Sequence, residues 1–138
     1  MRPLHALMTL AMGLVFTGAA NAYIPPQAAP ASHELEQSAE ALHEYMHDNY
    51  DGFASTSASH EFEEAAVALH DMLHEWEEGN ATEAQVADAR DAANDAMYEF
   101  VGAALSEWRS LRGDRALMQL LVDAIQDWLV INFLLQLV

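Results

Sequence analysis

Histidine, the commonest side-chain ligand for transition metals, occurs in this chain in a repeated pattern. The pattern is His-x9-His-x3-His, and its second copy begins 27 residues after the first. The two copies contain His33, His43 and His47, and then His60, His70 and His74. Between residues 33–50 and 60–77, 8 of 18 positions are identical. The repeat predicts a duplicated unit whose chemistry is metal binding.

The first 22 residues predict an export signal. Arg2 provides a positive charge, residues 4–20 are mainly apolar, and Ala20 and Ala22 form a small-x-small cleavage site. An uncleaved anchor is the alternative. We expect a periplasmic or secreted protein whose mature chain begins at Tyr23.

Composition excludes several partners and cofactors. The chain has a formal charge of −17 and no cysteine, so neither disulfides nor thiolate ligands occur. Loss of the signal leaves four arginines against 22 acidic residues, a formal charge of −18. Nucleic acids and anionic membranes would repel such a chain. The acid excess favours either solubility in a salty environment or the local accumulation of cations.

Turn and capping residues predict one domain of four helices at residues 32–138, preceded by a flexible Pro/Ala tether at residues 23–31. Ser32 and Ser59 are expected to cap the first two helices, and Ser55–Ser59 to form a loop. Thr82 and Gln85 form a capping box for the third helix, which should reach about Leu111. The fourth follows Gly113 and should continue almost to Val138. Short connections favour an all-α, up-down four-helix bundle whose first two helices are a duplicated antiparallel hairpin.

Apolar residues spaced 4-3-4 predict the buried seams of these helices. The seams comprise Leu35, Ala39, Leu42, Met46, Asn49 and Phe53; Phe62, Ala66, Leu69, Leu73 and Trp76; and Val86, Ala89, Ala93, Ala96 and Phe100. The fourth helix is more apolar and is expected to lie at the centre of the core. Asp123 and Asp127 argue against a membrane span. A homodimer or protein contact through this helix or through the hairpin is the alternative.

The histidines form a polar stripe beside each seam. If the loop midpoint lies near residues 53–54, the two stripes of the hairpin face each other. His47 is then level with His60 and His33 with His74, while His43 comes close to Glu63 and Glu36 to His70. Helical rise separates His33 from His43 by about 15 Å, too far to share one ion. The spacing therefore predicts two sites, each completed across the hairpin. Their candidate metal ligands are His43, His47, His60 and Glu63 in one site, and His33, Glu36, His70 and His74 in the other.

Three imidazoles and a carboxylate favour zinc, with copper(II) or nickel(II) as alternatives. We therefore expect a non-enzymatic protein that buffers, senses or delivers a divalent transition metal. The sequence contains no nucleophile–base pair and no phosphate-binding loop.

Four other interpretations remain open. A bundle without metal could bind a protein partner in the periplasm or in a stress response, or the histidines could sense pH. Haem b between histidine or methionine ligands, with Met97 as a candidate, is a less favoured cofactor. A di-iron site is disfavoured because the third and fourth helices offer no matching histidine.

Overall fold

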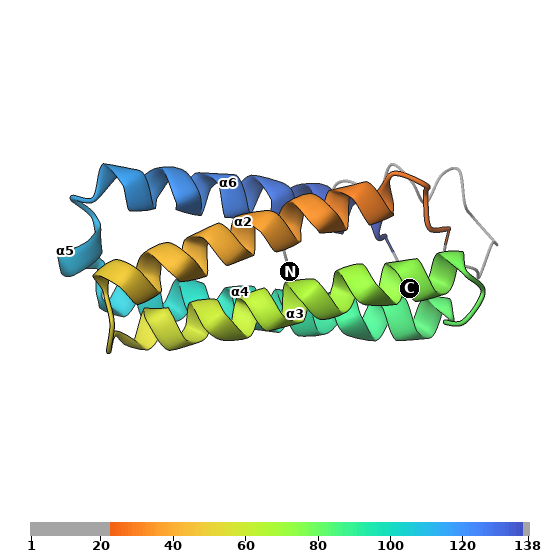
Figure 1. Ribbon diagram of the computed structural model, residues 1–138, viewed down its shortest axis with the longest axis horizontal. Helices are drawn as coiled ribbons and strands as arrows, with labels where there is room; N and C mark the ends of the chain where they lie inside the picture. The colour runs from red at the N-terminus through yellow and green to blue at the C-terminus, as the bar shows by residue number, and fades with distance from the viewer. Residues whose placement is uncertain (1–22, 137–138) are drawn as a thin grey trace.

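The computed structural model describes residues 23–136, and the predicted signal peptide lies outside the described residues. Within these residues the chain is all-helical, which confirms the predicted class. Its helices are α2 (Ala28–Asn49), α3 (Ala54–Glu77), α4 (Glu83–Ser106), α5 (Trp108–Leu111) and α6 (Arg115–Leu134). Figure 1 shows the four long helices side by side, with each running opposite to the one before it. Helix α5 lies at one end of the molecule.

The packing of α2 against α3 follows the 27-residue repeat. The seam residues Leu35, Leu42 and Met46 of α2 are fully buried, and the residues with the same spacing in α3 are buried as well. Every buried position of α2 has a buried counterpart in α3 exactly one repeat later, for example Leu35 and Phe62. Helix α2 also packs along α6, and α3 along α4. The centres of the predicted seams are therefore correct, although Asn49 is exposed.

The predicted starts of the first two helices are wrong. Helices α2 and α3 begin at Ala28 and Ala54, so the end of the expected tether and the expected Ser55–Ser59 loop are helical. Ser32 and Ser59 are fully buried inside the helices and are not caps. Their hydroxyls donate to carbonyls three residues earlier, at 2.7 and 2.6 Å. Each serine thus satisfies its own hydrogen-bonding need locally, which allows it to be buried.

A distant carboxylate explains the early start of α3. Phe53, at the N-cap position, has no capping side chain. The Glu107 carboxylate instead accepts from the backbone N–H groups of Ala54 and Ser55, both at 2.9 Å. Burial opposes the charge of Glu107, but hydrogen bonds from Ser55 and Ala54 outweigh it and lower the pKa of this carboxyl. Glu107 also interrupts the predicted third helix, which ends at Ser106 and is followed by α5.

The signals around α4 and α6 are largely confirmed. The Thr82–Gln85 capping box is present, with the Gln85 N–H donating to Thr82 Oγ1 at 3.2 Å. Helix α6 begins directly after Asp114, as the break at Gly113 predicted, but it ends at Leu134 rather than near Val138.

Helix α6 is not the central helix that its apolar composition suggested. It packs closely on α2, while Val122, Ile125, Val130 and Phe133 are 39–48% exposed. Among the described residues, it is the one helix long and apolar enough to cross a membrane, and 28% of its apolar window is buried. Core helices of soluble proteins also meet this criterion.

Helix α6 meets α4 through a buried polar network. Asn94 and Asn132 exchange two amide hydrogen bonds of 2.9 Å, and the Trp128 indole N–H donates to Asn94 Oδ1 at 2.7 Å. Near the end of α6, Arg90 donates to the Leu135 carbonyl at 2.9 Å. Buried polar groups are costly unless paired, so this network fixes how α6 is rotated relative to α4.

Asp114 joins the ends of α2 and α6. Its carboxylate caps α6 by accepting from the Leu117 N–H at 3.0 Å. The same carboxylate accepts hydroxyl hydrogen bonds from Tyr45 and Tyr50, each with a distance of 2.7 Å to Oδ2. The bond to Asp114, together with burial, raises the pKa of Tyr50 to about 12. The bond from Tyr50, followed by those from Leu117 and Tyr45, lowers the pKa of Asp114.

These shifts predict the pH dependence of this junction. Because the folded pKa of Tyr50 exceeds its ordinary value of 10.0, its contribution to stability is complete below pH 10 and is lost as the pH rises through about 12. Asp114 has the opposite dependence. Its contribution to stability is complete above its ordinary pKa of 3.8, and it is lost as the pH falls through the lower pKa of the folded state. In a spectrophotometric tyrosine titration, Tyr50→Phe should remove a transition near pH 12.

Asp114→Ala should move that transition towards pH 10 and lower the thermal unfolding midpoint, since both hydroxyls lose their acceptor and α6 loses its cap. Tyr98→Phe is the control and should leave the transition in place. A transition near pH 12 that survives Tyr50→Phe would contradict the assignment.

Candidate metal centres

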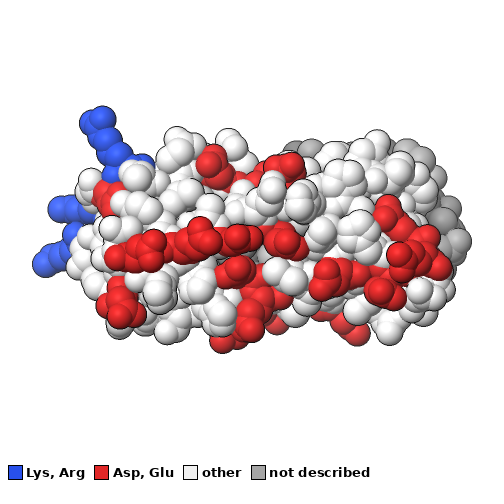
Figure 2. Space-filling view, in the orientation of Figure 1, with Lys and Arg blue, Asp and Glu red and all other residues white. Residues whose placement is uncertain are grey.

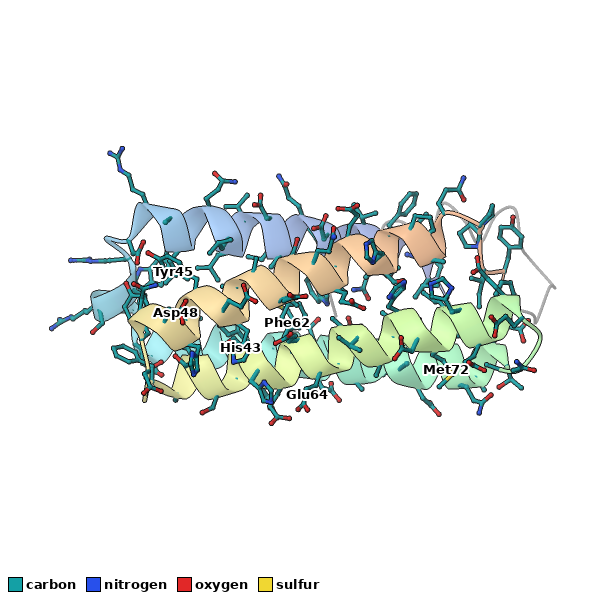
Figure 3. All side chains as sticks on the ribbon, in the orientation of Figure 1. His43, Tyr45, Asp48, Phe62, Glu64 and Met72 are labelled. Carbon is teal, nitrogen blue, oxygen red and sulfur yellow. The ribbon has the colours of Figure 1, made fainter. Side chains whose placement is uncertain are left out.

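The closed hairpin brings the predicted histidines and glutamates together at two places. We call His43, His47, His60 and Glu63 cluster A, and His33, Glu36, His70 and His74 cluster B. In Figure 3, His43 extends from α2 towards α3, in the space between the two helices. Two of the predicted contacts, His43 with Glu63 and His70 with Glu36, both occur. The rings beside His60 and His33 are those of His43 and His70, and not those of His47 and His74 as the register predicted.

Cluster A contains a short histidine–carboxylate pair. His43 Nδ1 lies 2.7 Å from Glu63 Oε1, and the side chains are 21% and 24% exposed. The His60 ring lies 4.8 Å from the His43 ring, centroid to centroid. His47 lies apart: its ring is 6.2 Å from that of His43. Its Nδ1 is 3.4 Å from Asp48 Oδ1, and its side chain is 68% exposed.

Cluster B repeats this geometry and adds one close contact. His70 Nδ1 lies 2.8 Å from Glu36 Oε1, with the side chains 16% and 22% exposed. The His33 ring lies 5.1 Å from the His70 ring. The His74 ring is only 4.5 Å from that of His70, and their Nε2 atoms are 2.9 Å apart. All four predicted residues of cluster B are therefore gathered.

In each cluster, three potential ligand atoms lie within 4.8 Å of one another. The groups are His43, His60 and Glu63 in cluster A, and His33, Glu36 and His70 in cluster B. The fourth predicted residue, His47 or His74, falls outside these groups, although His74 remains in contact with His70.

The hydrogen bonds determine which ring nitrogens are available. An ionised carboxylate can only accept, so Nδ1 of His43 and Nδ1 of His70 must donate to Glu63 and Glu36. In the neutral imidazole this leaves the Nε2 lone pair free. In cluster B, the free Nε2 of His70 then accepts from Nε2–H of His74. A histidine whose second nitrogen donates to a carboxylate is the usual arrangement of a metal ligand.

Two further carboxylates, which the repeat alone did not reveal, lie beside the clusters. Glu64 Oε1 lies 3.6 Å from His60 Nε2, and Glu77 Oε1 lies 3.6 Å from His74 Nδ1. The i,i+4 and i,i+3 spacings of these pairs were the available sequence signal. Figure 2 shows acidic side chains in rows along this face of the molecule. These charges favour a cation near the histidines.

An open hollow lies beside cluster B. It is lined by Pro26, Ala29, Pro30, His33, His70, His74 and Glu77. The residues one repeat after Ala29 and Pro30 are Thr56 and Ser57, so the proline wall is particular to cluster B. Met97, the candidate haem ligand, is 2% exposed and belongs to the apolar core.

Comparison with known proteins gives no relative from which a role could be transferred. The chain matches no protein-family model, no curated protein and no solved structure.

The hydrogen bonds to Glu63 and Glu36 predict which tautomer His43 and His70 adopt in the metal-free protein. His43 and His70 should carry a proton on Nδ1, which long-range proton–nitrogen correlation spectra of the imidazole rings would detect. Glu63→Ala should abolish this preference at His43, because Nδ1 loses its acceptor, and should leave His70 unchanged. Glu36→Ala should do the reverse, so each variant is the control for the other. A metal-free His43 protonated only on Nε2 would contradict the assignment.

Proposed function

We propose that this chain is an exported, acidic four-helix bundle that binds a divalent transition metal in two clusters on a duplicated hairpin. Its role would be to buffer, sense or deliver the metal in the periplasm or outside the cell. Zinc is the favoured ion, with copper(II) or nickel(II) as alternatives. The proposal gives the chain a binding role and no catalytic role.

The observation that carries the proposal is the position of the two glutamates in the histidine clusters. Glu63 and Glu36 each accept a hydrogen bond from Nδ1 of a half-buried histidine, at 2.7 and 2.8 Å. This hydrogen bond orients the ring, fixes its tautomer and increases the basicity of Nε2. We accordingly assign the glutamates a positioning role, where the sequence alone suggested direct ligation.

Cluster B has the better ligand geometry. Two nitrogens bound to one zinc ion at about 2.0–2.1 Å lie about 3.3–3.4 Å apart at the tetrahedral angle. His70 Nε2 and His74 Nε2 are 2.9 Å apart, so these atoms would have to separate by only about 0.4–0.5 Å to bind one ion. His33, whose ring lies 5.1 Å from that of His70, would be the third ligand after the His74 side chain turns towards it, because His74 lies outside the group of ligand atoms within 4.8 Å of one another. Water would complete the coordination. The same assignment in cluster A uses His43, His60 and His47 after rotation of the His47 side chain.

Metal titration tests the proposal directly. The purified protein, freed of metal by a chelator, should bind two zinc ions per chain in competition with a chromophoric chelator. Binding should weaken as the pH falls from about 7 to 5, because ligand imidazoles must lose their protons. A variant lacking all six histidines is the reference, and equal affinity for the wild type and this variant would refute the proposal. Glu44→Gln, at an exposed carboxylate outside the clusters, is the matched control.

Individual variants test the ligand sets. His60→Ala should weaken one of the two zinc sites by more than about tenfold, because loss of an outer carboxylate partner alone costs 10- to 100-fold. Glu63→Gln keeps an acceptor for His43 and should weaken the same site by a smaller factor. X-ray absorption spectra should show nitrogen scatterers typical of imidazole. Two zinc sites of unchanged affinity in both His60→Ala and His43→Ala would exclude cluster A.

The two sites should also differ in affinity. In cluster B the nitrogens of His70 and His74 already converge, whereas His47 of cluster A must leave solvent and lose side-chain entropy. His74→Ala should therefore weaken the tighter of the two binding constants, and His47→Ala the weaker one. Isothermal titration calorimetry of both variants would measure this. Identical effects on the two constants would show that the sites are equivalent.

A further inference from the structure

Four side chains at cluster B form a chain of contacts that begins and ends at a carboxylate. Glu36 Oε1 lies 2.8 Å from His70 Nδ1, and His70 Nε2 lies 2.9 Å from His74 Nε2. On the other side of its ring, His74 Nδ1 lies 3.6 Å from Glu77 Oε1. The first two contacts have hydrogen-bond lengths, whereas the third is too long for a hydrogen bond. The chain of contacts is therefore bonded at the Glu36 end and open at the Glu77 end.

The positions of the protons explain why the last contact is long. His70 donates from Nδ1 to Glu36, so its Nε2 can only accept when the ring is neutral. The proton between the two rings must therefore belong to Nε2 of His74. A neutral His74 then has a lone pair on Nδ1, which faces a carboxylate that can also only accept. Because neither group can donate, Glu77 and His74 do not form a hydrogen bond in the metal-free protein.

This arrangement of protons opposes metal binding by His74. A histidine binds a metal through a nitrogen that has lost its proton, and Nε2 of His74 is the ligand atom in the function proposed above. For a neutral ring, the Nε2–H bond must break and an Nδ1–H bond must form, with the proton exchanged through water. The number of protons on the ring stays the same, but Nδ1 changes from an acceptor to a donor.

Glu77 is placed to accept from this new donor. It is the last residue of α3, three positions after His74, and side chains with this spacing are neighbours on a helix. It also lines the hollow beside cluster B, together with the histidines of that cluster. The His74 and Glu77 side chains are 54% and 42% exposed, so neither is held in place by packing. A small rotation can therefore shorten their contact to the length of a charge-assisted hydrogen bond, about 2.7–2.9 Å.

Cluster A has a different residue at the equivalent position. The residue one repeat before Glu77 is Tyr50, whose hydroxyl donates to Asp114 at 2.7 Å. The rings of His43 and His47 are 6.2 Å apart, centroid to centroid, which is too far for the ring-to-ring hydrogen bond of cluster B. We therefore expect the change of proton position at cluster B only.

We propose that Glu77 is a positioning residue of cluster B, which accepts a hydrogen bond from His74 Nδ1 and thereby stabilises the tautomer whose Nε2 can bind a metal. Glu36 has the same relation to His70, so a carboxylate then lies behind each of these two ligand rings. Glu36 forms its bond before a metal binds, whereas Glu77 forms its bond only in the metal-bound protein. The inference rests on the proposed function, although the metal-free tautomer of His74 can be measured independently of it.

Imidazole nitrogen spectra test the change of proton position. The variant His43→Ala/His60→Ala disables cluster A, so the added zinc binds at cluster B alone. In the metal-free form of this variant, His74 should carry its proton on Nε2, as long-range proton–nitrogen correlation spectra would show. One equivalent of zinc should move this proton to Nδ1. His70 is the internal control, because its proton should stay on Nδ1 throughout.

Three substitutions in the same background separate positioning from charge attraction. Glu77→Ala removes the acceptor and should weaken zinc binding by about 10- to 100-fold, the usual effect of losing an outer hydrogen-bond partner. Glu77→Gln keeps an acceptor oxygen and should weaken binding by a smaller factor. Glu78→Gln is the matched control, because it removes the same charge one position later, at an exposed residue outside the lining of the hollow. It should leave the affinity, measured by competition with a chromophoric chelator, unchanged.

The outcomes distinguish this inference from the proposed function. No zinc binding by the variant with cluster A disabled would refute cluster B as a metal site, and the role of Glu77 with it. Zinc binding without a change in the His74 tautomer would overturn the role of Glu77 alone, as would a metal-free His74 already protonated only on Nδ1. Equal losses of affinity in Glu77→Gln and Glu78→Gln would show that Glu77 acts through its charge, and would also overturn the proposal.

Discussion

The register of α2 against α3 is the constraint on which the candidate chemistry depends. The fully buried residues Leu35, Leu42 and Met46 pack in the core with their counterparts one repeat later in this alignment of the hairpin. A shift by one turn would expose or overpack several of these side chains, at a cost of about 1–3 kcal/mol for each overpacked contact. The same alignment places a histidine nitrogen 2.7–2.8 Å from a carboxylate at two points. Apolar packing thus positions the polar groups beside it.

The repeat also explains why the two clusters resemble each other without being equivalent. An antiparallel pair of similar helices is related to itself by a local two-fold axis, so the His43–Glu63 contact implies the His70–Glu36 contact. The chain breaks this symmetry outside the repeat. Prolines near the start of α2 line a hollow at cluster B, whereas His47 is next to Asp48 in the turn region of cluster A. In our proposal, such differences give the two clusters different affinities for the metal.

The second half of the bundle stabilises the hairpin through side chains that come from far along the sequence. Glu107 supplies the acceptor that α3 lacks at its own start, and Asp114 joins α6 to two tyrosines near the end of α2. The Asn94–Asn132 pair fixes the rotation of α6, which leaves Val122, Ile125 and Phe133 exposed.

The sequence by itself determined the helical class, the spacing of the buried seams and the contacts of His43 with Glu63 and of His70 with Glu36. The class and the seams follow from helical periodicity, which occurs in both copies of the 27-residue repeat. The two contacts follow from this periodicity together with the position of the loop between the copies. The tertiary structure alone decided the early start of α3, the break at Glu107 and the exposure of Ile125. Each depends on groups more than 50 residues apart or on the choice of neighbouring helix, as in the contact of Glu107 with Ala54. Helical periodicity shows which residues share a face, but it does not show which helix covers that face or which distant side chain caps a helix end.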